Sequence, residues 1–233
     1  MPEVLSPDSG TEAAVDAKAL AERAEGRANL YFLLATLFLE APGAQALEKL
    51  KSVEMTSVMD EAGLTLGTEL LEAPTSQLVE LLAVEFTRLF LFSPQGRLAP
   101  YESLQRTKAS GLLKGPESDQ VSAYIEAAGF DYSSQFQEMP DHLSVQLEFL
   151  AHLCHEESTA WETGNVSAAN NAIEFQRDFF NSFLGTWVFR FMEKVQAKSE
   201  MEFYRGLATF AVEFLQEEQS AFNHAVHPPP AGP

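Results

Sequence analysis

The side chains most capable of chemistry lie within one short stretch. Residues 137–157 read QEMPDHLSVQLEFLAHLCHEE, in which an Asp-His pair follows a proline and further polar groups follow the pair. Glu148, His152 and His155 are spaced i, i+4, i+7, so a helix would place them on one face. Imidazole and carboxylate groups bind zinc or iron. Without an HExxH or CxxC pattern, a metal-binding or enzymatic helical protein using these three residues remains the alternative interpretation.

The single cysteine is a weak candidate for catalysis. Cys154 shares a helical stripe with Leu143, Leu147 and Leu150, which predicts that its thiol is buried and that its thiolate is suppressed. The chain also lacks the GxSxG, GxGxxG and GxxxxGK[ST] patterns that place a nucleophile or a phosphate. We therefore predict no catalytic residue, no bound metal and no cofactor, and a protein that is not an enzyme.

The Asp141-His142 pair has two open interpretations. Asp141 follows Pro140 and precedes an apolar periodic run, so it is a natural N-cap for a helix over 141–163. The pair also ends an irregular stretch, 129–142, and loops between helices often carry binding residues. A carboxylate at that place accepts hydrogen bonds from an arginine guanidinium in a bidentate manner.

The distribution of charge favours a cationic partner. Thirty-four acids against 15 bases give a net charge of −19, which disfavours nucleic acid and anionic membrane surfaces. No lysine or arginine occurs between Lys114 and Arg177, a span of 62 residues that contains eleven acids. Ion pairs with lysine or arginine inside this span are impossible, so its carboxylates are neutralised from elsewhere or left open to a partner.

Helical periodicity dominates the rest of the chain. We expect helices over 13–40, 44–60, 74–92, 118–129, 141–163 and 166–195, and another after a Ser199/Glu202 capping box. These form one all-α domain of roughly eight to eleven helices at 13–222, between a flexible N-terminus (1–12) and a disordered Pro-rich tail (223–233). The longest apolar run, 30–39, is too short to span a bilayer and the N-terminus lacks a basic export signal, which predicts a cytoplasmic protein without stable membrane insertion.

Three short motifs resemble one family. They are Phe-Thr-Arg-Leu-Phe at 86–90, Pro-Tyr-Glu-Ser at 100–103 and Met-Pro-Asp-His-Leu at 139–143, which leads into Leu-Glu-Phe-Leu. Together with Phe203-Tyr204, Leu207-Ala208 and Phe214-Leu215, they resemble the TorD/DmsD/NarJ family of cytoplasmic chaperones for molybdenum-dependent redox enzymes. The likeness runs over roughly 30–220.

The resemblance implies a TorD-like fold and a system-specific chaperone. Such a protein binds the twin-arginine signal peptide, or the apo catalytic subunit, of a molybdenum-containing oxidoreductase. It assists cofactor insertion and delays export until folding is complete, as a monomer or homodimer. A second alternative is a scaffold subunit retained within a redox complex.

The resemblance also implies a recognition site. By motif match it contains Pro140, Asp141 and His142, with Pro100, Tyr101, Glu102 and Ser103 across from them. We expect Asp141, Glu102 or Glu138 to pair the two arginines of the leader. Tyr101 and exposed parts of Phe90 and Phe92 would cover its apolar segment.

Overall fold

A computed structural model of the chain describes residues 9–91, 98–106, 111–113, 115–130 and 138–226. Every regular element in these ranges is a helix, and the only extended pairing among them is an isolated bridge between Tyr101 and His142. The predicted all-α class is confirmed, and the eleven α-helices found in the described ranges fall within the expected number. None of the helices described is long and apolar enough to cross a membrane.

In chain order the helices are α1 (Ser9–Leu39), α2 (Ala44–Leu50), α3 (Val53–Glu61), α4 (Glu69–Glu72), α5 (Thr75–Phe86), the π-helical turn η1 (Thr87–Leu91), α6 (Glu102–Gln105), α7 (Pro116–Ala127), α8 (Leu143–Glu162), α9 (Val166–Ser182), the 3₁₀ turn η2 (Leu184–Thr186), α10 (Val188–Lys198) and α11 (Glu202–Val226). The longest connections between α-helices in the chain are those that precede α6 and α8. Helix α1 already begins at Ser9 and α11 continues to Val226, so helix extends across the predicted divisions at 12 and 223. Residues 1–8 and 227–233 lie outside the described ranges, so the flexible N-terminus and the disordered tail stay predictions.

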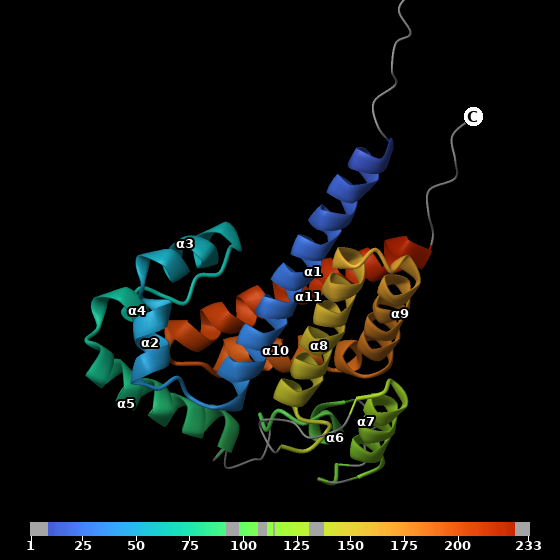
Figure 1. Cartoon of the computed structure of the whole chain (residues 1–233). Helices are drawn as coiled ribbons and strands as arrows, with labels where there is room; N and C mark the ends of the chain where they lie inside the picture. Colours follow the sequence, from blue (N-terminus) through green and yellow to red (C-terminus); the bar gives the residue numbers. More distant parts are fainter. Residues whose placement is uncertain (1–8, 92–97, 107–110, 114, 131–137, 227–233) are drawn as a thin grey trace, which may run out of the picture.

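The long helix α1 packs along α8, and α11 crosses both (Figure 1). Every residue from Leu143 to Ala151 is buried, so the first half of α8 contacts neighbours on all sides. Helices α2 to α5 lie at one end of this arrangement and α6, α7 and α9 at the other (Figure 1). Cys154 is fully buried on α8, as its apolar stripe predicted.

Aromatic side chains fill the core where α1, α5, α10 and α11 meet. Phe90 lies at the centre of this cluster. Its ring centroid is 4.9 to 6.2 Å from those of its aromatic neighbours Phe38, Phe86, Phe191 and Tyr204. Only 4% of Phe90 is exposed. The expectation that Phe90 offers an exposed surface to a ligand is therefore wrong, because the π-helical turn directs its ring into the core.

Two predicted helices are each divided in two. The 44–60 helix breaks at Ser52, whose hydroxyl accepts a hydrogen bond from Met55 N–H and so caps α3. The 166–195 helix breaks between α9 and α10. There Gly185 lies so close to Phe180 that an added Cβ would come within 2.9 Å of the Phe180 carbonyl oxygen. Close packing of that turn requires glycine.

The predicted capping box before α11 does not form. The Ser199 hydroxyl donates to the Val195 carbonyl in α10 instead. The Glu202 carboxylate accepts from Thr68 N–H, and the N–H of Phe203 donates to the Glu69 carboxylate at 2.7 Å. Carboxylates that are distant in sequence thus cap α11, a possibility that a local pattern does not reveal.

Candidate functional site

The two irregular segments predicted to bind a ligand lie side by side. Glu102 N–H donates to the Asp141 carbonyl at 2.9 Å, and Leu143 N–H donates to the Pro100 carbonyl at 2.8 Å. The rings of Tyr101 and His142 pack edge to face with centroids 4.8 Å apart. Residues 100–103 and 139–143 therefore form one surface, although about 40 residues separate them in the chain.

Asp141 holds this surface together. Its side chain is fully buried, and Oδ2 accepts from Ser103 N–H at 3.2 Å, at the start of α6. It does not cap α8, as one interpretation expected, because His142 is the N-cap of that helix. Among the described residues, Asp141 Oδ1 and Ser103 Oγ are buried without a hydrogen-bond partner. Asp141 has no exposed oxygen for a guanidinium in this arrangement, so its predicted direct contact with arginine requires correction.

His142 is a neutral, buried side chain. Its Nδ1 accepts from Ser144 N–H at 3.2 Å and lies 2.6 Å from the Ser144 hydroxyl, which leaves the ring proton on Nε2. Burial lowers the pKa of His142 to about 4. The ring thus combines a helix cap with a packing contact to Tyr101.

Glu102 is a second buried carboxylate, and it is held by groups that the sequence did not single out. Its Oε2 accepts from Gln146 Nε2 at 2.7 Å, and Gln146 in turn accepts from Trp187 Nε1 at 3.1 Å. Arg106 donates to the other carboxylate oxygen at 2.9 Å. Burial raises the pKa of Glu102, against the opposing effects of Gln146 and Arg106. A glutamine within the apolar run LSVQLEFL was the one signal for this network.

The accessible part of the surface combines an acid with apolar side chains. Half-buried Glu138 accepts from the Tyr101 hydroxyl at 3.0 Å. Gly111 N–H donates to the Ser103 carbonyl, which places the exposed side chains of Leu112 and Leu113 beside α6. Of the other predicted residues, Pro140 is half-buried, Pro100 is buried, and Phe92 lies outside the described residues.

The alternative metal-binding set is not assembled. Glu148 is buried with the His152 ring 3.9 Å away, whereas His155 Nδ1 lies 2.9 Å from a carboxylate oxygen of Glu25 in α1. Within the ranges that the structure describes, no three His, Cys, Asp or Glu side chains come together as a metal site would require. Burial also raises the pKa of the Cys154 thiol.

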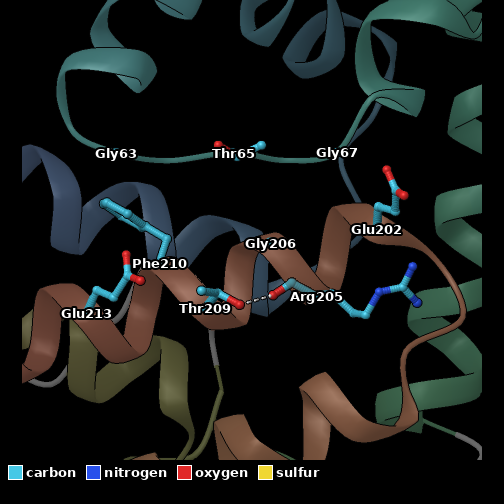
Figure 2. Close-up of a pocket in the computed structure, with 9 residues that line it drawn as sticks. All are labelled: Gly63, Thr65, Gly67, Glu202, Arg205, Gly206, Thr209, Phe210 and Glu213. Carbon is cyan, nitrogen blue, oxygen red and sulfur yellow. Dashed lines mark hydrogen bonds between the residues drawn. The ribbon is translucent and has the colours of Figure 1, made fainter.

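A separate pocket of about 440 Å³ lies between the 63–67 segment and α11 (Figure 2). Glu202, Arg205, Thr209 and Glu213 are among its lining residues. The segment crosses the helix at Gly206, where an added Cβ would lie 1.9 Å from the Thr65 carbonyl oxygen. No residue of the predicted recognition site lines this pocket.

Comparisons with known proteins were consistent with one another. A family model described as the nitrate reductase delta subunit matches residues 39–193, more than half of the chain. A chaperone protein TorD of Vibrio cholerae serotype O1 is 29% identical over 205 residues, which cover 84% of this chain and 91% of that protein. A chaperone protein TorD of a Shewanella species is 28% identical over 215 residues, covering 86% and 96% respectively. These relatives are named as chaperones, which supports the prediction that this chain is not an enzyme.

One solved structure also resembles the chain. It is described as a redox enzyme maturation protein from Archaeoglobus fulgidus, shares 20% sequence identity and covers 84% of this chain and 93% of its own. The TM-score between the two structures is 0.42.

Proposed function

Because the chain belongs to the nitrate reductase delta subunit family, which includes the TorD chaperones, and is a redox-enzyme maturation chaperone, we propose that its client is a molybdenum-containing oxidoreductase. The chaperone binds the twin-arginine leader of the catalytic-subunit precursor in the cytoplasm. It holds the precursor until the cofactor has been inserted, and only then is the precursor exported. The chaperone itself supplies no chemistry to this step.

The bridge between Tyr101 and His142 is the observation that carries the proposal. It supports a composite surface in which half-buried Glu138 lies beside the Tyr101 ring, with Leu112 and Leu113 exposed near α6. A leader peptide presents guanidiniums followed by an apolar segment. Glu138 pairs with a guanidinium, and the Tyr101 ring and the two leucines cover apolar side chains. Asp141 acts by holding α6 in place.

Binding of a synthetic leader peptide tests the proposal. A peptide with two consecutive arginines and its apolar segment should bind, and raising the salt concentration should weaken binding because it screens guanidinium–carboxylate attraction. Glu138→Gln should weaken binding by about ten- to thirtyfold, because a hydrogen bond to a charged group contributes about 1.5–2 kcal/mol. Fluorescence anisotropy with a labelled peptide measures both effects.

Glu162→Gln is the matched control, because Glu162 is an exposed carboxylate at the opposite end of α8. It changes the net charge by the same amount as Glu138→Gln and should leave the affinity nearly unchanged. A protein that ignores the peptide, or that responds equally to both substitutions, would contradict the assignment.

A further inference from the structure

Glu102 is a preorganised carboxylate. Its side chain is fully buried. Gln146 donates to its Oε2 at 2.7 Å, and Trp187 holds Gln146 in turn by donating to the amide oxygen at 3.1 Å. A buried carboxylate is stable only with a cation or enough hydrogen bonds beside it. Because Gln146 holds Oε2, Oε1 is the oxygen that faces a cation.

Arg106 supplies that group through a limited contact. One nitrogen, Nη1, lies 2.9 Å from Glu102 Oε1, and the guanidinium makes no other hydrogen bond with the residues described. By contrast, Arg27 and Arg88 each bind a carboxylate through two nitrogens. The Arg106 side chain is 34% exposed, whereas the Glu102 side chain has no exposure. Arg106 is thus the accessible member of the pair, and its bond to Glu102 is weaker than a bidentate bond.

We propose that Arg106 occupies the place of a leader arginine, and that the incoming guanidinium displaces it from Glu102. The inference rests on the proposed function and identifies a second carboxylate that receives the leader. Exchanging one guanidinium for another keeps Glu102 paired in both states, so binding does not leave a bare charge in the core. Released Arg106 returns to solvent, which hydrates its guanidinium.

This exchange makes Arg106 an internal competitor. If the pair is closed about 90% of the time, the apparent affinity for the leader is reduced about tenfold. The exchange also favours arginine over lysine, because a guanidinium is more weakly hydrated than an ammonium and loses less hydration when it pairs with a buried carboxylate.

Substitution of Arg106 tests the inference. In leader-peptide titrations Arg106→Gln should bind about five- to tenfold more tightly than the wild type. Arg177→Gln is the charge-matched control, because Arg177 pairs with its neighbour Asp178 on α9 and its loss changes the net charge equally. The gain in peptide affinity from Arg106→Gln must therefore be larger than any gain from Arg177→Gln. Adding Glu102→Gln to Arg106→Gln should abolish the gain.

Thermal unfolding and a second variant keep the test decisive if Arg106→Gln is unstable. Arg106→Lys retains a cation, but an ammonium is more strongly hydrated than a guanidinium and should pair less with Glu102, so this variant should show an intermediate gain in affinity. The peptide should raise the melting temperature of both variants more than that of the wild type. A wild type that binds, with neither Arg106 variant tighter than Arg177→Gln, would overturn only this inference. A wild type and variants that all fail to bind would overturn the proposed function as well.

Discussion

At the scale of single residues, most polar groups of the three sequence motifs are buried. They hold the segments 100–103 and 139–143 together and are not exposed to a ligand. Asp141 uses its carbonyl and one carboxylate oxygen to hold the first two N–H groups of α6. His142 caps α8 and packs on Tyr101. The side chains at the accessible part of this surface are Tyr101, Glu138 and Arg106. Substituting Asp141 would therefore affect binding through the position of α6.

His142 should make the stability of the protein depend on pH. Its folded pKa of about 4 lies below the ordinary value of 6.5, so its contribution is fully present above pH 6.5 and is lost as the pH falls towards 4. Between pH 7 and pH 5 the loss is on the order of 2 kcal/mol. His142→Asn keeps a capping acceptor but cannot titrate.

Urea unfolding of both proteins across this range measures the effect. The wild type should lose about 2 kcal/mol more than His142→Asn on acidification. Carboxylates whose protonation also lowers stability are shared by the two proteins, so their effect cancels in the comparison. If the unfolding free energies of the wild type and of His142→Asn fell equally between pH 7 and pH 5, the His142 imidazole would not be held neutral.

The sequence predicted which motif segments meet but not how deeply their side chains are buried. The pairing of 100–103 with 139–143 followed from the family resemblance. Burial of Glu102 depends on Gln146 of α8 and on Trp187, which lies between η2 and α10. Such contacts are fixed by tertiary packing, and one glutamine in an apolar run does not specify its partner.

At the scale of elements, periodicity located the helices and tertiary contacts decided where they break. The apolar spacing of α5 and α8 identified both helices within a few residues of their bounds. The breaks at Ser52 and Gly185 interrupt runs that remain helical in pattern on both sides. The start of α11 was wrongly assigned a local cap because the acceptors, Glu69 and Glu85, come from other segments. Sequence spacing cannot detect caps of that kind.

Two helical glycines should respond oppositely to alanine. Gly26 in α1 has no atom within 4 Å of an added Cβ, so Gly26→Ala should raise the unfolding free energy by about 0.5–1 kcal/mol. Gly206 in α11 lies against the 63–67 segment, and its added Cβ would meet the Thr65 carbonyl at 1.9 Å. Gly206→Ala should therefore lower the unfolding free energy by about 1–3 kcal/mol.

Chemical denaturation of the two variants compares them directly. Helix propensity favours alanine at both sites, so any difference in sign reports the contact between α11 and the 63–67 segment. Equal stabilisation by both substitutions would mean that the segment moves aside freely. The bond from Thr68 N–H to Glu202 opposes such movement.

At the scale of the whole molecule, the base-free span is neutralised in part from outside. Arg27 of α1 donates to Glu157 in α8, to Gln176 in α9 and to Glu218 in α11. Tyr31 adds a hydrogen bond from its hydroxyl to Glu218. One guanidinium thus joins four helices in the interior. Of the carboxylates in the span, Glu157 is paired by this arginine, whereas half-buried Glu138 accepts a hydrogen bond from the Tyr101 hydroxyl.

Replacing Arg27 should therefore be far more damaging than removing a surface charge from the same helix. Arg27→Met would leave Glu157 and Glu218 buried without their cation, which should cost about 3–5 kcal/mol of unfolding free energy. Arg23→Met, one turn earlier at an exposed position, should change it by about 0.5 kcal/mol or less. Adding Glu157→Gln and Glu218→Gln to Arg27→Met should restore much of the loss, because the two unpaired charges are then gone. Urea unfolding monitored by circular dichroism distinguishes these outcomes, and equal stability of the two single variants would show that Arg27 does not join the helices energetically.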